Sequence, residues 1–319
     1  MKRIISLVCL VGFVQAFSWE WEEYKRSHNK IYEDESEEEL RWRTFNANKE
    51  IIDRHNEQYA AGKETFEMGV NQFTDLSPNE FESLMLSSQN MTEDEEDLIY
   101  DPPKSLKIPK SVDWRKLNAV TPVKDQGKCG SCWAFAAVAT LEGRHFLKTK
   151  ELINLSEQNL VDCSKRNKGC NGGLITWALK YIKKNRGIDT AKSYPYEAEQ
   201  HHCRFSKLNV GATVLGIKKV RKRRESELAA AVATEGPIGV AVDASPFHHY
   251  RRGVLRKRCH KRANHAVTVV GYGTDHKGLD YWLVKNSWGT PFGENGYIRM
   301  ARNHHNLCHI ASHAVYPVV

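Results

Sequence analysis

The sequence has no apolar run long enough to cross a membrane. Its longest apolar stretch covers residues 4–14, after Lys2 and Arg3, whereas a transmembrane helix needs about 20 apolar residues. A basic start, a short apolar stretch and the small residue Ala16 are typical of a secretory signal peptide. We therefore predict a signal peptide over residues 1–16, a secreted or lysosomal protein, and no membrane span. The alternative is a buried N-terminal helix, which those flanking residues do not favour.

The sequence also lacks internal repeats and an even number of cysteines after the predicted signal. The absence of repeats excludes an architecture of stacked repeating units. Of the eight cysteines, Cys9 leaves with the signal, and seven remain. Disulfides persist in exported proteins, so an odd number leaves at least one thiol unpaired or bonded to another chain.

Each part of the chain is poor in charge of one sign. Residues 17–107 hold 23 Asp and Glu against 10 Lys and Arg, whereas residues 108–319 hold 16 against 35. The resulting net charges of −13 and +19 predict that the two parts attract each other. Residues 90–103 carry an acidic run and end in two prolines, which indicates an exposed, protease-accessible linker.

The pattern of apolar residues predicts helices first and strands later. One helix is expected over residues 19–56, where residues three or four apart share a face. A second, buried helix is expected over residues 131–148. Apolar segments rich in β-branched and aromatic residues predict strands at residues 238–242, 266–272, 281–285 and 297–301. This order indicates an α+β molecule of two lobes with a site in the cleft between them.

Three separate motifs predict nucleophilic catalysis. Cys132 lies in a Cys-Gly-Ser-Cys-Trp motif, His265 follows 133 residues later, and Asn286 follows 154 residues after Cys132. A thiol attacks a carbonyl as its thiolate, which the N-terminus of the predicted helix favours. The imidazole can take the thiol proton and return it to the leaving amine, while the amide orients the ring. Gln126 and the backbone N–H of Cys132 are candidates for stabilising the oxyanion.

Each of these residues also has a non-catalytic interpretation. Cys132 could be a disulfide partner or a core thiol, His265 a core histidine, and Asn286 a turn residue. Cys129 and Cys132 also form a CxxC pair of the kind used in redox proteins. The order of the three motifs favours catalysis, and the surrounding sequence lacks a small βαβ redox domain.

At these residues the chain resembles the papain family of cysteine proteases, over nearly its whole length after the signal. Residues 69–75 resemble the family's GxNxFxD motif, and the predicted first helix resembles its ERFNIN motif at Glu37, Arg41, Phe45, Asn48, Ile52 and Asn56. Both motifs indicate the cathepsin L-like branch. The resemblance implies an α+β papain-like fold, with a helical left lobe, a β-barrel-like right lobe and the cleft between them. It divides the chain into a helical inhibitory prosegment over residues 17–107 and a mature peptidase domain over residues 108–319.

The resemblance implies a cysteine endopeptidase that forms an acyl-enzyme through a thiolate–imidazolium pair, and a zymogen that acid pH activates. No insertion blocks one end of the expected cleft, which favours an endopeptidase over an exopeptidase. The expected partners are protein and peptide substrates, the chain's own prosegment and cystatin-like inhibitors. We expect a monomer that needs no cofactor and no metal.

The resemblance also assigns roles to residues. Cys132 is the nucleophile, His265 the acid and base, Asn286 the orienting residue, Gln126 the oxyanion donor, and Trp288 the shield of the His–Asn bond. It pairs the remaining cysteines as Cys129–Cys170, Cys163–Cys203 and Cys259–Cys308.

The resemblance further assigns the substrate-binding residues. The walls of the cleft are Gly130, Gly172 and Gly173, where backbone approaches substrate backbone closely. The pocket for P2, the residue two before the scissile bond, is formed by Leu174, Ile175, Ala241, Ala263 and His313. Because four of these five are apolar, we expect an apolar or aromatic P2. His313 departs from the small or acidic residues of close relatives, and its alternative is an ordinary surface histidine. Asn264 also departs, since Asp is usual there.

Two further features belong to an exported, basic domain. Asn90 and Asn154 lie in glycosylation sequons. The basic runs over residues 218–224 and 251–262 are either solvated faces or a binding site for polyanions such as sulfated glycans. A polyanion-binding protein or a protease inhibitor of the same fold without catalysis is therefore the alternative function. The intact Cys132, His265 and Asn286 argue against it.

Overall fold

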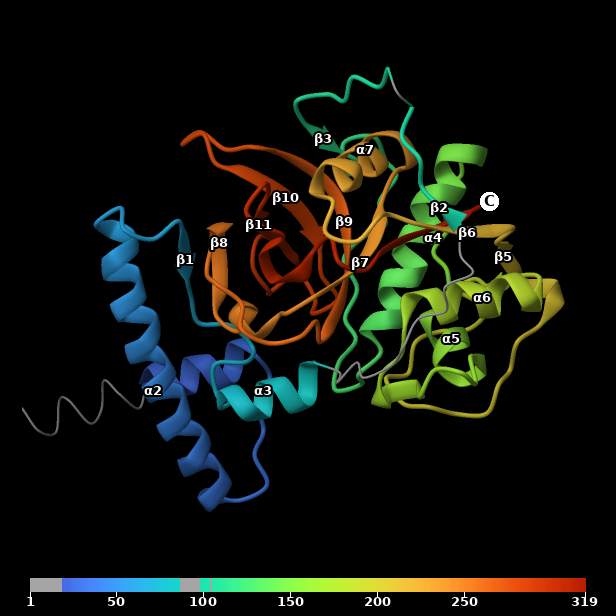
Figure 1. The fold of residues 1–319 in the computed structure, drawn as a ribbon. Coiled ribbons are helices and arrows are strands. Elements are labelled where there is room, and N and C mark those ends of the chain that lie inside the picture. The colour runs from blue at the N-terminus through green and yellow to red at the C-terminus, as the bar shows by residue number, and fades with distance from the viewer. Residues whose placement is uncertain (1–18, 87–97, 104) are drawn as a thin grey trace, which may run out of the picture.

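The computed structural model describes residues 19–86, 98–103 and 105–319 (Figure 1). The predicted signal peptide, the sequon residue Asn90 and most of the predicted linker lie outside the described residues. No helix in the described ranges is long and apolar enough to cross a membrane.

The acidic segment forms a small helical unit against the rest of the molecule. It consists of a helix over residues 19–27, then α2 (Glu35–Ala60), β1 (Phe66–Met68) and α3 (Pro78–Met85). The prediction of one continuous helix over residues 19–56 is wrong. The backbone of Asn29 is left-handed, with φ 51°, and Asp34 starts α2 by accepting a hydrogen bond from the Glu37 N–H.

The break in the predicted helix has a tertiary cause. It lets Trp21 and Tyr24 fold back onto Phe45, with ring centroids 5.4 and 4.6 Å from that ring. The three side chains are buried together. Burial of large aromatic side chains stabilises the bent arrangement, which a helix-period pattern in the sequence does not reveal.

The first half of the basic part is mainly helical, as predicted. Its long buried helix is α4 (Cys132–Thr149), within one residue of the expected range. The other helical elements of the basic part are α5 (Glu157–Cys163), η1 (Gly169–Asn171), α6 (Ile175–Asn185), η2 (Lys207–Asn209), α7 (Glu225–Glu235), η3 (Ser245–Phe247) and η4 (Leu307–His309). Figure 1 shows α4, α5 and α6 grouped on one side of the molecule, and α2 on the outside of the strands.

A ten-stranded sheet forms most of the second lobe. All four predicted strand segments are confirmed, as β7 (Ile238–Val242), β9 (His265–Thr274), β10 (Asp280–Lys285) and β11 (Tyr297–Ala301). The remaining strands are β2 (Leu98–Ile99), β3 (Val112–Asp113), β6 (Gly216–Lys219), β8 (Tyr250–Leu255) and β12 (Ala314–Val318), with β4 (Ile188–Asp189) and β5 (Val210–Ala212) as a separate pair. The order β1-β8-β11-β10-β9-β7-β12-β6-β2, with β3 on β9, places strands of the acidic segment at both ends.

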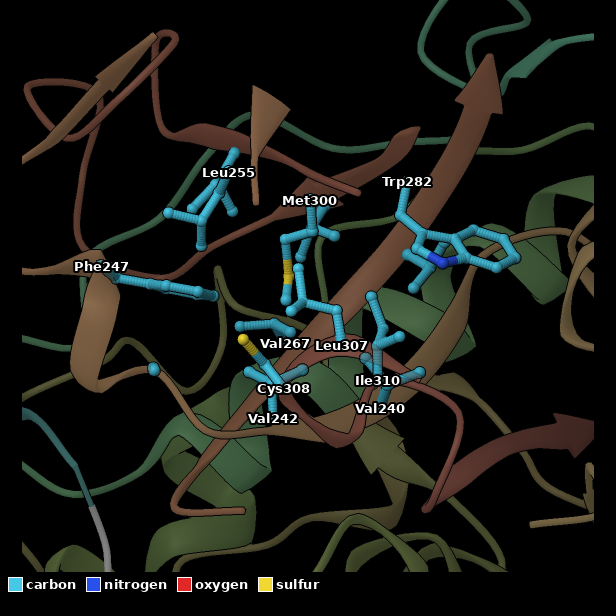
Figure 2. Packing of buried hydrophobic residues seen from close by; sticks show 14 of the residues in the cluster. Val240, Val242, Phe247, Leu255, Val267, Trp282, Met300, Leu307, Cys308 and Ile310 are labelled. Carbon is cyan, nitrogen blue, oxygen red and sulfur yellow. The ribbon is translucent and has the colours of Figure 1, made fainter. Parts of the chain in front are cut away.

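Two large hydrophobic clusters correspond to the two lobes. One lies around α4 and α6. The other lies within the sheet, where Val240, Val267, Trp282, Met300 and Ile310 pack together (Figure 2). The second cluster also contains apolar residues of the acidic segment, namely Ile52, Phe66, Met68, Phe73, Leu76, Phe81, Met85, Leu86 and Tyr100. The acidic segment is therefore bound to the sheet lobe by apolar burial as well as by charge.

Candidate active site

The thiol of Cys132 lies at the N-terminus of α4, at the contact between the lobes. The structure contains the disulfides Cys129–Cys170, Cys163–Cys203 and Cys259–Cys308, and Cys132 takes part in none of them. The backbone N–H of Ala266 in β9 points to Cys132 Sγ at 3.4 Å. A helix N-terminus stabilises an anion, so both lobes favour a thiolate at this position.

His265 starts β9 and is fully buried. Its Nε2 lies 2.8 Å from Asn286 Oδ1, while its Nδ1 has no hydrogen-bond partner among the described residues. Burial lowers the pKa of His265 to about 4, although the hydrogen bond with Asn286 raises it. The imidazole is therefore neutral at neutral pH in this form, with Nδ1 available to accept a proton.

Trp288 covers the histidine. Its ring is fully buried and stacks on the His265 ring at 4.7 Å between centroids. A large apolar ring at this distance excludes water from the bond between His265 and Asn286. Loss of competing water strengthens such a bond.

Gln126 is also fully buried and is held at both ends of its amide. Ser287 Oγ donates a hydrogen bond to Gln126 Oε1 at 2.7 Å, and Gln126 Nε2 donates one to Cys129 O at 3.0 Å. An amide nitrogen carries two hydrogens, so the second is available to a substrate oxygen. Because Ser287 follows Asn286, one short loop positions both amides.

The three predicted cleft glycines have structural reasons of their own. A Cβ at Gly130 would lie 2.5 Å from Cys170 O, and a Cβ at Gly173 would lie 2.4 Å from Asn167 Oδ1. Gly172 has a φ of 108°, where other residues are strained. The protein's own packing therefore requires glycine here, in addition to any approach by substrate.

One cavity of about 240 Å³ brings together all five residues predicted for the P2 pocket. The residues that the sequence prediction missed there are Arg262, Ala266, His309, Ser312 and Val315. Ala266 also contacts the Cys132 thiol, so this cavity lies beside that sulfur. The expectation of a largely apolar pocket is incomplete, because Arg262, His309 and His313 form a basic part of its lining. In the sequence, only the position of Arg262 within the basic run over residues 251–262 could have indicated a basic lining.

Asn264 contacts the protein rather than lining this cavity. Its Oδ1 accepts a hydrogen bond from the Ala244 N–H at 2.9 Å. Its Nδ2 lies 3.3 Å from both Asp243 Oδ1 and Ser245 Oγ. An amide can make both kinds of bond at once, so Asn264 ties the residues directly before β9 to the loop at Asp243–Ser245.

A buried ionic network lies under the site, and the sequence analysis did not find it. Lys124 Nζ lies 2.9 Å from Glu142 Oε1 in α4 and 2.7 Å from Glu157 Oε1 in α5. Lys285 Nζ donates to Thr121 O at 2.8 Å, and burial lowers the pKa of this lysine to about 8. Thr121 Oγ1 accepts from Lys285 Nζ at 2.9 Å and donates to Glu142 Oε2 at 2.6 Å, so the network anchors the end of β10, directly before Asn286.

The acidic segment covers the site from the sheet lobe. Gln72 Nε2 donates to Trp288 O at 2.7 Å, and the rings of Phe73 and Phe81 meet the edge of Trp288, each with centroids 5.4 Å away. Glu67 pairs with Arg251 and Arg252, Glu82 with Lys261, and Asp101 with Arg221. These contacts hold the acidic segment on the sheet lobe and on the Trp288 ring that stacks on His265.

Comparison with known proteins agrees with this geometry. The family model described as "Papain family cysteine protease" matches residues 108–318, and "Cathepsin propeptide inhibitor domain (I29)" matches residues 21–81. Cathepsin L of Sarcophaga peregrina is 47% identical, with 99% of each chain covered. Cathepsin L1 of Drosophila melanogaster is 48% identical, over 99% of this chain and 91% of that protein.

Among solved structures, a digestive procathepsin L 3 from the larval midgut of Tenebrio molitor superposes with a TM-score of 0.88. The two sequences are 39% identical, and the superposition covers 95% of this chain and 99% of the Tenebrio molitor chain. The fold, the covering propeptide and these relatives agree. The chain therefore belongs to the papain family of cysteine proteases, as the precursor form of a cathepsin L-like member.

Proposed function

We propose that this precursor yields a secreted or lysosomal endopeptidase in which Cys132, His265, Asn286 and Gln126 perform the reaction. The observation that carries the proposal is the arrangement of His265. Its Nε2 is held by Asn286 at 2.8 Å, and the next residue, Ala266, contacts the Cys132 thiol. A nucleophile, a base and an orienting group in this order are the requirement for covalent catalysis.

The reaction follows from these positions. His265 Nδ1 takes the proton of the Cys132 thiol, and the thiolate attacks the peptide carbonyl. The oxygen of the tetrahedral intermediate receives hydrogen bonds from Gln126 Nε2 and the Cys132 N–H. The imidazolium then protonates the leaving amine, which leaves an acyl-enzyme, and His265 activates the water that hydrolyses it.

Processing is the second part of this proposal. We expect residues 1–16 to be removed as a signal peptide, residues 17–107 to act as the prosegment, and residues 108–319 to form the mature enzyme. Cleavage is expected between about residues 90 and 110, because that segment follows the folded inhibitory unit. Exposed Asn154 is the glycosylation site among the described residues. Binding of cystatin-like inhibitors stays a prediction from the family.

One experiment tests the proposed function as a whole. The purified precursor should shorten itself when the pH is lowered from 7 to about 4, and hydrolysis of a Phe-Arg amide substrate should appear with the shortening. N-terminal sequencing of the product should place the new terminus between residues 90 and 110. A precursor that is shortened but hydrolyses no peptide would contradict the proposed endopeptidase.

The lining of the P2 cavity predicts a specificity that changes with pH. Leu174, Ile175 and Ala241 suit a P2 Leu or Phe, whereas Arg262 and His313 can pair with a P2 Glu. Imidazoles gain a proton as the pH falls from about 7 to 4.5. The ratio of kcat/KM for P2 Glu over P2 Leu should therefore rise several-fold, because a partly exposed ion pair is worth about 1 kcal/mol.

Two variants separate the contributions to this specificity. His313→Ala should lose the rise of the ratio with acid, and Arg262→Gln should lower the ratio at every pH. Protonation of the substrate Glu will blunt the rise at its acid end. If His313→Ala and the wild type give the same kcat/KM ratio at every pH, His313 does not contribute to the P2 specificity.

Binding of a polyanion is a second candidate function. The specific observation is that Arg251 and Arg252 hold the Glu67 carboxylate between them, and Arg221 pairs with Asp101. These cations already bind anionic groups of the prosegment, so the mature form would offer them to a sulfated glycan. Removal of the prosegment should raise the salt concentration that elutes the protein from a heparin column. Equal elution of precursor and mature forms would contradict this candidate.

A further inference from the structure

We propose that His248 and His249 of the mature domain couple release of the prosegment to proton uptake, and so act as an acid-sensitive latch of the zymogen. The two residues lie between η3 and β8, about 17 residues before His265 and outside the site described above. The proposal goes beyond the protease function and concerns how acid opens this precursor.

The prosegment packs directly on His248, and His249 continues the same stack of rings. Phe81 of α3 stacks on His248 with centroids 4.3 Å apart, and His248 stacks on His249 at 3.9 Å. His248 Nε2 lies 2.9 Å from Phe73 O. Because a carbonyl oxygen only accepts, Nε2 carries the hydrogen of this bond. Both histidines are buried in the precursor.

The backbone of the pair is also covered by the prosegment. His248 O accepts a hydrogen bond from Asn71 Nδ2 at 2.7 Å, and His249 O accepts one from the Gly69 N–H at 2.9 Å. His249 Nδ1 is buried without a hydrogen-bond partner among the described residues. A second charge at 3.9 Å from the first would have no fixed counter-ion, which is costly in a buried place.

The charged groups that face the pair do not offset this cost. Asp75 and Glu82 of the prosegment favour a charged His248, but desolvation outweighs them and lowers its pKa to about 4. Desolvation, with repulsion from His248 and Lys257, lowers the pKa of His249 to about 3. Asp75 is already held by Lys30, and Glu82 by Lys261, so each carboxylate has another cation to satisfy.

The direction of the pH effect follows from the thermodynamic linkage between proton binding by the two histidines and release of the prosegment. An uncovered histidine titrates near pH 6.5, whereas the covered pair stays neutral to about pH 4. Above pH 6.5 neither form binds a proton, so the affinity of the prosegment does not change. Between about pH 6.5 and 4 the released form binds more protons, and the prosegment is therefore weakened as the pH falls. One histidine can contribute about tenfold for each pH unit below its free pKa.

The pH range distinguishes the effect of the two histidines from the effect of the ion pairs that also hold the prosegment. Carboxylates have reference pKa values near 4, so ion pairs such as Glu82–Lys261 weaken mainly at the acid end. Between pH 6.5 and 5 His248 and His249 gain protons when they are uncovered. We expect the pair together to raise opening of the zymogen by about tenfold or more over this range.

Opening can be measured on the full-length zymogen by the reactivity of Cys132, which is buried when the prosegment is closed. The initial rate of labelling by a thiol-directed epoxide, divided by the rate for the mature enzyme at the same pH, reports the open fraction. The wild-type ratio should rise about tenfold from pH 6.5 to 5. The ratio of the double variant His248→Gln, His249→Phe should stay nearly constant, because neither new side chain titrates in this range. Gln keeps a donor for Phe73 O, and Phe keeps an apolar ring of similar size at position 249.

The control is His276→Gln, which replaces an exposed histidine of the mature domain and should follow the wild type. A double variant with the wild-type rise would overturn the proposal. If the double variant does not fold, NMR titration of the wild-type histidines decides. Both imidazoles should titrate near pH 6 in the mature enzyme and remain neutral at pH 5 in the zymogen. Titration near pH 6.5 in both forms would overturn the latch. Failure of the mature enzyme to react with the epoxide would instead contradict the role of Cys132.

Discussion

Replacing Cys132 with alanine is expected to lower kcat/KM for a peptide amide by about 10⁴-fold or more, since covalent nucleophiles carry effects of this size. The thiol stands at the start of α4 and contacts the Ala266 N–H across the lobes. Alanine removes the sulfur without adding volume. The precursor of this variant should also fail to shorten itself at acid pH. Both losses would be measured with the same protein, by steady-state hydrolysis and by gel.

The control must show that the variant is folded. Its melting temperature should match that of the wild-type precursor, and a thiol-directed epoxide should label the wild-type mature enzyme once and the variant not at all. Ser131→Ala changes the neighbouring side chain, whose hydroxyl bonds Tyr196, and should keep the activity within about tenfold, the range of one lost hydrogen bond. Hydrolysis by Cys132→Ala above about one hundredth of wild type would refute the nucleophile assignment.

Replacing Gln126 with alanine should lower kcat by about 10²–10³-fold, the effect of losing one oxyanion donor. Gln126 Nε2 has one hydrogen bonded to Cys129 O, and its second hydrogen bonds no acceptor within the described part of the chain. KM should therefore change little, because the lost bond forms only with the tetrahedral intermediate. Steady-state kinetics of the mature variant would separate the two parameters.

A matched control is Gln158→Ala, which removes another fully buried glutamine of the same domain. Gln158 bonds Asp162 and Glu199 O in the helical lobe, so this variant should lose stability but retain kcat. If Gln126→Ala raises KM and leaves kcat intact, Gln126 binds substrate and does not stabilise the oxyanion.

Much of the local structure was predictable because it depends on neighbours along the chain. The content of apolar, β-branched and aromatic residues located β7 and β11, and a long apolar segment located α4, to within a residue. The family motifs around Cys132, His265 and Asn286 identified the chemistry, because each reactive group needs particular residues directly beside it. The same reasoning failed for residues 19–56, where contacts between Trp21 and Phe45 break the helix.

The sequence by itself thus determined the family and most of the regular elements, and it supplied the proposal for the reactive residues. Only the tertiary structure decided which polar groups are buried together. The network of Lys124, Glu142 and Lys285 joins residues that are ordinary charges in the sequence. His248 becomes a candidate proton sensor only because Phe73 and Phe81, more than 160 residues earlier, cover it. Burial changes the cost of a charge, and burial depends on segments that are distant in the chain, which local patterns do not encode.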